Sequence, residues 1–186
     1  MSPRAEATHT TLAELLPLED KTVSSFEMSS DMGEEGLLIL EIFRPRPDMA
    51  ELVIAGRTQR LLVEPHRITQ LSGGTVLEEP LQKGHEFTGP FGRTTIVDDD
   101  VRVELPAGKF EHCLTTVEES QRPAKRAVST YCRGVGLAHL VVETFGEDAV
   151  RLETRLTSHG PRFDVHDDAS QAPDTPPADT ASAPSE

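Results

Sequence analysis

The stretch Phe110–Val135 constrains this chain most, because it divides into two segments with complementary side chains. If Ser120–Lys125 form the loop, residues whose numbers sum to 245 face each other across an antiparallel pair. This alignment places Thr opposite Thr, Val opposite Val and Glu opposite Arg, and cross-strand pairs of these types stabilise a sheet. A slip of one residue would turn every side chain of one strand to the wrong face. The sequence therefore predicts a hairpin with a specified register. Its pairs are Cys113–Cys132, Thr115–Thr130, Val117–Val128 and Glu119–Arg126 on one face, and Leu114–Tyr131, Thr116–Ser129 and Phe110–Val135 on the other.

Period-2 alternation and short turn signals continue through most of the chain, and this pattern is typical of antiparallel strands. One helical turn is expected near the N-terminus, at Thr11–Leu16, with Thr10 or Thr11 as N-cap and Glu14 in the first turn. The fold class is therefore an all-β antiparallel meander with one short N-terminal helical turn. The other expected strands are Leu37–Phe43, Glu51–Ala55, Thr58–Glu64, Arg67–Leu71, Thr75–Glu78, Thr94–Val97 and Val101–Leu105.

A further hairpin is expected where Gly146-Glu147 fits a type II′ turn, with glycine at its first central position. Partners whose numbers sum to 293 then place Val141 opposite Leu152 and Leu137 opposite Leu156. The two strands, Leu137–Phe145 and Ala149–Thr157, are apolar enough on both faces to predict a central place in the sheet.

Composition separates the domain from both ends of the chain. Residues 164–186 contain six acidic residues, four prolines and no Lys or Arg, so they have little to bury and are expected to form a disordered acidic Pro/Ala/Ser-rich tail. Such a tail is either an interaction segment or only a solubilising one. Residues 1–10 are polar and unpatterned, and are expected to be disordered. Residues 11–163 are expected to form a single β-domain.

Charge and apolar content exclude two classes of protein. The chain of 186 residues has a net charge of −14 and 4% aromatic residues, whereas nucleic-acid binding needs Lys and Arg for phosphates and rings for bases. No apolar run reaches the roughly 18 residues that a transmembrane helix needs. We therefore expect no nucleic-acid partner and no transmembrane segment.

The two cysteines fall opposite each other in the predicted hairpin. Opposed positions of a non-hydrogen-bonded pair have Cα atoms about 4.5 Å apart, which suits a disulfide. A bridge Cys113–Cys132 would indicate an oxidising compartment. The alternative is two free, buried thiols that behave as small apolar side chains.

No motif for catalysis or for metal or cofactor binding is present, so we expect no cofactor and no metal. The seven histidines are scattered, and no C-x-x-C, P-loop, G-x-S-x-G or H-E-x-x-H occurs. His112 precedes Cys113 on a strand and would point to the other face, so it is a poor base for that thiol. The triplet Asp98–Asp100 is interpreted as a solvated hairpin tip, because the spacing of a calcium loop is missing.

Two segments carry structural turn signals. Pro106 and Gly108, ahead of Phe110, predict a tight turn, and Gly134 and Gly136 predict a bend or bulge between strands. Together these segments read V-E-L-P-A-G-K-F-E-H-C-L-T-T-V from Val103 and Y-C-R-G-V-G-L from Tyr131.

These residues resemble a family of bacterial envelope domains, some called TapB-like, whose pattern is V-P-A-G-x-F-x-x-C-L-x-V followed by Y-x-x-G-V-G-L. The segment Pro80–Phe87 resembles a further element of that family, P-L-x-x-G-x-x-aromatic, and the matching region spans about Pro80–Leu137. Cys132 departs from the family pattern, and the family's lipobox is missing. The resemblance implies a curved antiparallel sheet, similar to the half-barrels of the lipoprotein carriers LolA and LolB.

Three interpretations of function follow. The first is a non-enzymatic envelope domain that binds an apolar ligand, such as a lipid, or a partner protein. The second is a structural or assembly protein without a ligand. The third is a hydrolase whose site is assembled from dispersed histidines and carboxylates, with candidates His66, His85, His112 and His139. The resemblance implies the periplasm or cell envelope, but no signal peptide is visible, so a cytoplasmic location is the alternative.

Overall fold

The structure, a computed structural model, describes residues 10–162. The predictions of disorder for residues 1–9 and for the acidic tail lie outside the described residues. One helical turn and twelve strands follow one another along the chain: α1 (Leu12–Leu15), β1 (Thr22–Ser30), β2 (Glu35–Arg46), β3 (Met49–Ile54), β4 (Arg57–Glu64), β5 (Arg67–Gln70), β6 (Thr75–Glu78), β7 (Glu86–Thr88), β8 (Arg93–Leu105), β9 (Gly108–Gln121), β10 (Ala124–Cys132), β11 (Gly136–Thr144) and β12 (Arg151–Pro161). None of the helices in this part of the chain is long and apolar enough to cross a bilayer.

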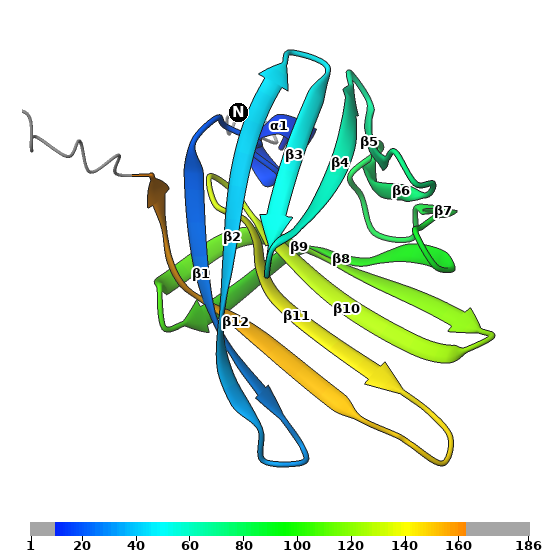
Figure 1. Cartoon of the computed structure of the whole chain (residues 1–186). Coiled ribbons are helices and arrows are strands. Elements are labelled where there is room, and N and C mark those ends of the chain that lie inside the picture. Colours follow the sequence, from blue (N-terminus) through cyan, green and yellow to red (C-terminus); the bar gives the residue numbers. More distant parts are fainter. Residues whose placement is uncertain (1–9, 163–186) are drawn as a thin grey trace, which may run out of the picture.

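The twelve strands form one antiparallel sheet in the order β6-β5-β4-β3-β2-β1-β12-β11-β10-β9-β8-β7. Every neighbouring pair is consecutive in sequence except β1 and β12, the first and last strands. The sheet curls until its two edge strands, β6 and β7, approach each other, which gives a nearly closed, barrel-like shape (Figure 1). The predicted all-β meander with a curved sheet is confirmed.

The short helix forms for a local reason and lies behind β2 and β3 in Figure 1. Of the two predicted N-caps, Thr10 and Thr11, the structure selects Thr11, and Glu14 lies in the first turn as predicted. The Thr11 and Glu14 side chains in addition satisfy each other's backbone amides in a capping box. The side chains of Leu12 and Leu15, which belong to this helix, are buried. Arg133 forms an ion pair with Glu14, and the Gly134 amide donates to the Glu14 carbonyl, so the β10–β11 turn holds α1 in place.

The predicted register of β9 and β10 is confirmed. Thr115 pairs with Thr130, Val117 with Val128 and Leu114 with Tyr131. The strands extend further than expected, because Gln121 pairs with Ala124 and only Arg122 and Pro123 remain in the turn.

The prediction of a hairpin tip at Asp98–Asp100 is wrong. These residues lie within β8, which pairs with β9 along most of its length, and the turn falls at Pro106-Ala107 instead. Three shifts of register accommodate the acidic run. Aspartate is disfavoured in strands, but bulges tolerate it by leaving residues unpaired, and the Asp100 carboxylate contacts the His112 ring at 2.8 Å.

The predicted register of β11 and β12 is wrong by one residue. Val142, not Val141, pairs with Leu152, and Val141 faces Glu153. The reason lies in the connection, where Gly146 does not start a two-residue turn. The Thr144 hydroxyl accepts from the Val150 amide, and the Thr144 amide donates to the Val150 carbonyl, so a longer loop closes the hairpin.

The strand limits near the N-terminus also differ from expectation. Thr22–Ser30 forms β1, a strand that the sequence analysis did not assign. The predicted strand Leu37–Phe43 continues as β2 to Arg46 through an irregularity after Phe43. Pro45 lies at this irregularity, where its missing backbone amide is tolerated because a bulge leaves residues unpaired.

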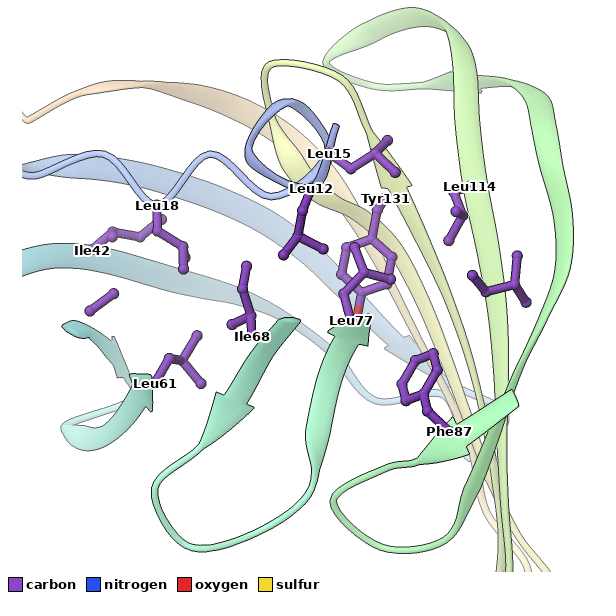
Figure 2. Packing of buried hydrophobic residues seen from close by; sticks show 12 residues of the cluster. Leu12, Leu15, Leu18, Ile42, Leu61, Ile68, Leu77, Phe87, Leu114 and Tyr131 are labelled. Atoms are coloured by element: carbon purple, nitrogen blue, oxygen red, sulfur yellow. The ribbon is translucent and has the colours of Figure 1, made fainter. Parts of the chain in front are cut away.

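The main core fills the end of the barrel that α1 covers. Figure 2 shows Leu12 and Leu15 of the helix close to Tyr131, with side chains from β4–β6 on one side and from β9 and β10 on the other. Its buried members are Leu12, Leu15, Leu18, Ile42, Ala50, Leu61, Ile68, Leu77, Phe87, Ile96, Leu114 and Tyr131.

A second cluster forms where the far end of the β8–β9 hairpin crosses the sheet. The predicted pairing of Phe110 with Val135 is wrong, because Phe110 pairs with Val103 and Val135 lies in the β10–β11 turn. Both side chains nevertheless pack in this cluster, around Phe26 and Leu156. The Ala107 amide donates to the Leu156 carbonyl, 3.0 Å away, beyond the point where β11 stops pairing with β12. The hairpin tip therefore takes the place that β11 leaves vacant.

The disulfide lies in this second cluster. Cys113 and Cys132 are fully buried and bridged, with Cα atoms 4.2 Å apart. The bridge joins β9 and β10 one position beyond Leu114 and Tyr131, the last pair of their ladder, and it lies next to the crossing tip of the β8–β9 hairpin. It therefore fixes the end of the β9–β10 hairpin that is far from its turn.

Cys113→Ser and Cys132→Ser should each lower the free energy of unfolding by about 3 kcal/mol, because the bridge closes a loop whose ends are 19 positions apart. Both variants remove the same bond, so the double variant should be no less stable than either one. Urea unfolding of the three variants measures this. Additive losses would contradict a shared bridge.

The seam between β6 and β7 is covered by two turns in contact. A Cβ built on Gly74, in the β5–β6 turn, would lie 2.4 Å from Cα of Pro90 in the β7–β8 turn. Gly73 has a similar positive φ but nothing within 4 Å of such a Cβ. Glycine at position 74 is therefore required by close approach as well as by backbone conformation.

Gly74→Ala should cost at least ~2 kcal/mol more stability than Gly73→Ala. Both alanines adopt a strained positive φ, but only the one at position 74 forces two backbones apart. Denaturant unfolding gives the difference, and hydrogen exchange should show faster exchange at the seam in Gly74→Ala alone. Equal losses in the two variants would show that the turns are not in contact.

Candidate functional site

A cavity of about 330 Å³ lies inside the curved sheet. Its wall comes from both halves of the meander and from the segment that leads from α1 to β1, so residues far apart in sequence meet around it. Most of the lining is apolar: Leu16, Pro17, Leu18, Leu40, Ile42, Leu52, Ile54, Leu61, Val76, Pro90, Phe91, Ala127, Tyr131, Val135, Leu137, Leu140 and Val142.

The cavity changes from apolar to polar along β9, β10 and β11. The rung nearest α1 consists of Leu114, Tyr131 and Leu137. The next rung toward the β9–β10 turn is Thr116, Ser129 and Leu140, and the one after it is Glu118, Ala127 and Val142. Lys125 lines the cavity beyond that rung, toward the β9–β10 turn. The apolar end is therefore the one closed by the helix.

Glu118 is the single acid among the described residues that line the cavity, and it is 9% exposed. Its Oε1 accepts hydrogen bonds from the amides of Phe91 and Gly92, at 2.8 and 2.9 Å. Burial raises the pKa of this carboxyl, and the two amides and Lys125 oppose that shift. The β7–β8 turn thus holds a buried carboxyl at a fixed place in the wall.

Lys125 is the single base among the described lining residues. Its Nζ lies over the Phe91 ring, 4.3 Å from the centroid, a cation–π contact that keeps the ammonium near the Glu118 rung. Thr94 pairs with Glu118 across β8 and β9 and also lines the cavity. Its hydroxyl oxygen is buried and has no hydrogen-bond partner among the described residues.

A serine–histidine contact also reaches the cavity wall. Ser24, which is buried and lines the cavity, lies opposite His159 in the β1–β12 ladder, and its hydroxyl oxygen is 2.9 Å from Nδ1 of the ring. Burial is the main cause that lowers the pKa of His159, and the Glu19 charge and a hydrogen bond to the Gly134 backbone oppose it.

The four histidines considered for a hydrolase do not converge. His66, His112 and His139 each lie 2.8 Å from a different carboxylate, those of Glu79, Asp100 and Glu153 respectively. None of these histidines lines the cavity, and neither does His85, which faces Glu78 at 3.5 Å. Within residues 10–162, no group of three or more His, Cys, Asp or Glu side chains is arranged to hold a metal ion.

The turn residues singled out in the sequence position the site from a distance. Pro106 and Gly108 form the turn at the tip of the β8–β9 hairpin, ahead of Phe110 in the second cluster. Gly134 and Gly136 both have φ of +79°, and a Cβ on Gly136 would lie 3.3 Å from the Leu16 side chain. Gly136 therefore lets the segment after α1 lie close against the cavity wall.

Similarity to known proteins is confined to the fold. No family model and no curated protein matches the sequence. A solved structure of a candidate exported protein with a YmcC-like fold, from Bacteroides fragilis, superposes with a TM-score of 0.51 at 10% identity, over 78% of this chain and 98% of that one. A candidate lipoprotein from Parabacteroides distasonis gives a TM-score of 0.46 at 12% identity, over the same shares of the two chains. The first of these likenesses shows a shared fold, and the TapB-like and LolA/LolB resemblances stay predictions.

Sequence analysis missed the polar residues of the cavity. One signal was present, since Glu118 is in phase with Leu114 and Thr116 on the face of β9 that the hairpin register assigns to one side. A carboxyl in phase with core positions is uncommon unless it has partners. No sequence signal connects it to Lys125 or Thr94, because their proximity depends on how the hairpins curl.

Replacing Glu118 by glutamine should stabilise the protein increasingly as pH rises above about 4.5. A carboxyl whose pKa is raised by folding is penalised once it ionises, so the wild type loses stability on going from acid to neutral pH, whereas glutamine keeps an acceptor for both amides. Urea unfolding at pH 3 and pH 7 tests this, with the exposed neighbour Glu119→Gln as control. A Glu118→Gln effect that does not grow with pH would contradict it.

Proposed function

We propose that this chain is a non-enzymatic domain of the bacterial envelope that binds an apolar ligand inside its curved sheet. The cavity carries the proposal. Its volume of about 330 Å³ falls in the range of small-molecule sites, about 300–1,000 Å³, and its lining combines many apolar side chains with a few polar ones, as such sites do.

Two observations support the envelope location. The shared fold with a candidate exported protein is the first. The second is the buried disulfide, because such bonds persist in oxidising compartments such as the periplasm and are rare in the cytosol.

The other two interpretations have less support. A structural or assembly role would act through sheet edges or through the acidic tail, and that tail lies outside the described residues. The first interpretation also included binding of a partner protein. None of the features described above favours a partner protein over a ligand in the cavity.

A hydrolase is the second candidate because Ser24 contacts His159 at the cavity wall. A serine and a histidine within hydrogen-bond distance are the minimum for nucleophilic catalysis. The two residues are also direct partners in the β1–β12 ladder, where such a contact forms without any catalytic role. Turnover of 4-nitrophenyl esters that Ser24→Ala abolishes would establish the hydrolase and overturn the proposal of a binding domain.

Ala127→Phe should weaken ligand binding at least tenfold while the fold is retained. Ala127 lines the cavity and is 6% exposed, so a phenyl ring there occupies the space that the ligand needs. The probe is N-phenyl-1-naphthylamine, an uncharged dye that fluoresces in apolar surroundings. We expect wild type to bind it and Ala127→Phe to bind at least tenfold more weakly.

The control is Val128→Phe, the next residue on β10, which lies outside the cavity lining and should bind the dye as wild type does. Circular dichroism shows whether both variants fold. Native mass spectrometry of unreduced protein, purified from a host periplasm, would in addition detect a bound lipid. Absence of dye binding by folded wild type, together with a bare mass, would overturn the proposed function.

A further inference from the structure

Polar groups at one end of the cavity identify the chemistry of the ligand. Thr94 and Glu118 pair across β8 and β9, and Lys125 lies two positions beyond the Glu118 partner Ala127 on β10. These three residues are referred to below as the polar rung. The opposite end, beneath α1, is lined by Leu16, Leu18 and Leu137. A ligand that satisfies both ends has an apolar chain and a polar headgroup.

We propose that the cavity takes an uncharged single-chain amphiphile, with its chain toward α1 and a hydroxylated headgroup at the polar rung. This inference rests on the proposed function and specifies its ligand. The volume of about 330 Å³ lies at the lower end of small-molecule sites, which suits one acyl chain rather than a two-chain lipid.

The charges of the polar rung favour an uncharged headgroup. Glu118 and Lys125 are the two charged residues among the described lining residues, and their signs are opposite. A carboxylate or an ammonium headgroup would be attracted by one of these groups and repelled by the other, so little net attraction would offset the hydration that it loses on entering the cavity. A hydroxyl donates to the carboxyl and accepts from the ammonium, so it meets both groups without adding charge.

The unpartnered hydroxyl of Thr94 is a second, independent observation in favour of a hydroxylated headgroup. The side chain of Thr94 is 3% exposed, and its hydroxyl oxygen has no partner among the described residues, although buried hydroxyls normally have one. Glu118, its partner across the ladder, uses Oε1 for the Phe91 and Gly92 amides. The oxygen is covered in this structure, because a Cβ built on Gly89 would lie 2.3 Å from it, so the Thr94 side chain has to turn about χ1 to reach a ligand in the cavity that it lines. A headgroup hydroxyl at the polar rung would then supply the partner that Thr94 lacks.

The test compares three amphiphiles of equal chain length as competitors of N-phenyl-1-naphthylamine. These are 1-monomyristoylglycerol, myristic acid and tetradecylamine at neutral pH. We expect the monoacylglycerol to displace the dye at a concentration at least tenfold lower than the acid or the amine. An equal or stronger effect of either charged amphiphile would overturn the inference.

Three variants connect that preference to the polar rung. Thr94→Val removes the hydroxyl at nearly constant volume and should reduce the preference at least threefold, whereas Thr94→Ser should keep it. Thr95→Val is the matched control, because Thr95 follows on β8, lies outside the cavity lining and should leave the preference unchanged. Thr95→Val should also bind the dye itself as wild type does, and circular dichroism shows whether all three variants fold. An unaltered preference in folded Thr94→Val would overturn the assignment of the headgroup.

The outcomes separate this inference from the proposed function. Dye binding without headgroup preference would overturn the inference and leave a cavity that binds apolar ligands. Failure of folded wild type to bind the dye or any of the three amphiphiles would overturn both.

Discussion

The pairing of β1 with β12 is the constraint on which the rest of the structure depends. These are the first and last strands of the sheet, and their ladder extends from Thr22–Pro161 to Ser30–Leu152. All other neighbouring strands are also neighbours in sequence and pair through short connections. The β1–β12 ladder joins the two halves of the meander into one sheet and closes a loop of more than a hundred residues between Ser30 and Leu152. The entropy cost of closing such a loop is tolerable, because it grows only slowly with loop length. Without it, the walls of the cavity would not face each other.

Because the two halves of the meander join at β1 and β12, the free edges of the sheet are β6 and β7. These two edge strands contact each other only to a small extent. Exposed edges invite pairing with other chains. Here the β5–β6 and β7–β8 turns meet at Gly74 and Pro90, and the same β7–β8 turn donates two amides to Glu118. The turn that covers the seam therefore also positions the polar end of the cavity.

The sequence predicted hairpins well where side chains on both strands agreed, as in β9 and β10, because cross-strand pairs are local and their types are readable. It failed where a turn or an unfavourable residue was decisive. The loop that Thr144 closes shifted β11 against β12 by one residue, and bulges let Asp98–Asp100 continue a strand. Such features depend on backbone hydrogen bonds that residue types alone do not specify.

By itself, the sequence determined the antiparallel meander, the capped helical turn and the opposition of Cys113 and Cys132, because each depends on residues close together in the chain. Only the tertiary structure decided that β1 meets β12, that α1 closes one end and that Thr94, Glu118 and Lys125 share the other. The physical reason is that curvature of the sheet brings together side chains whose separation in sequence carries no signal, and a cavity exists only between such side chains.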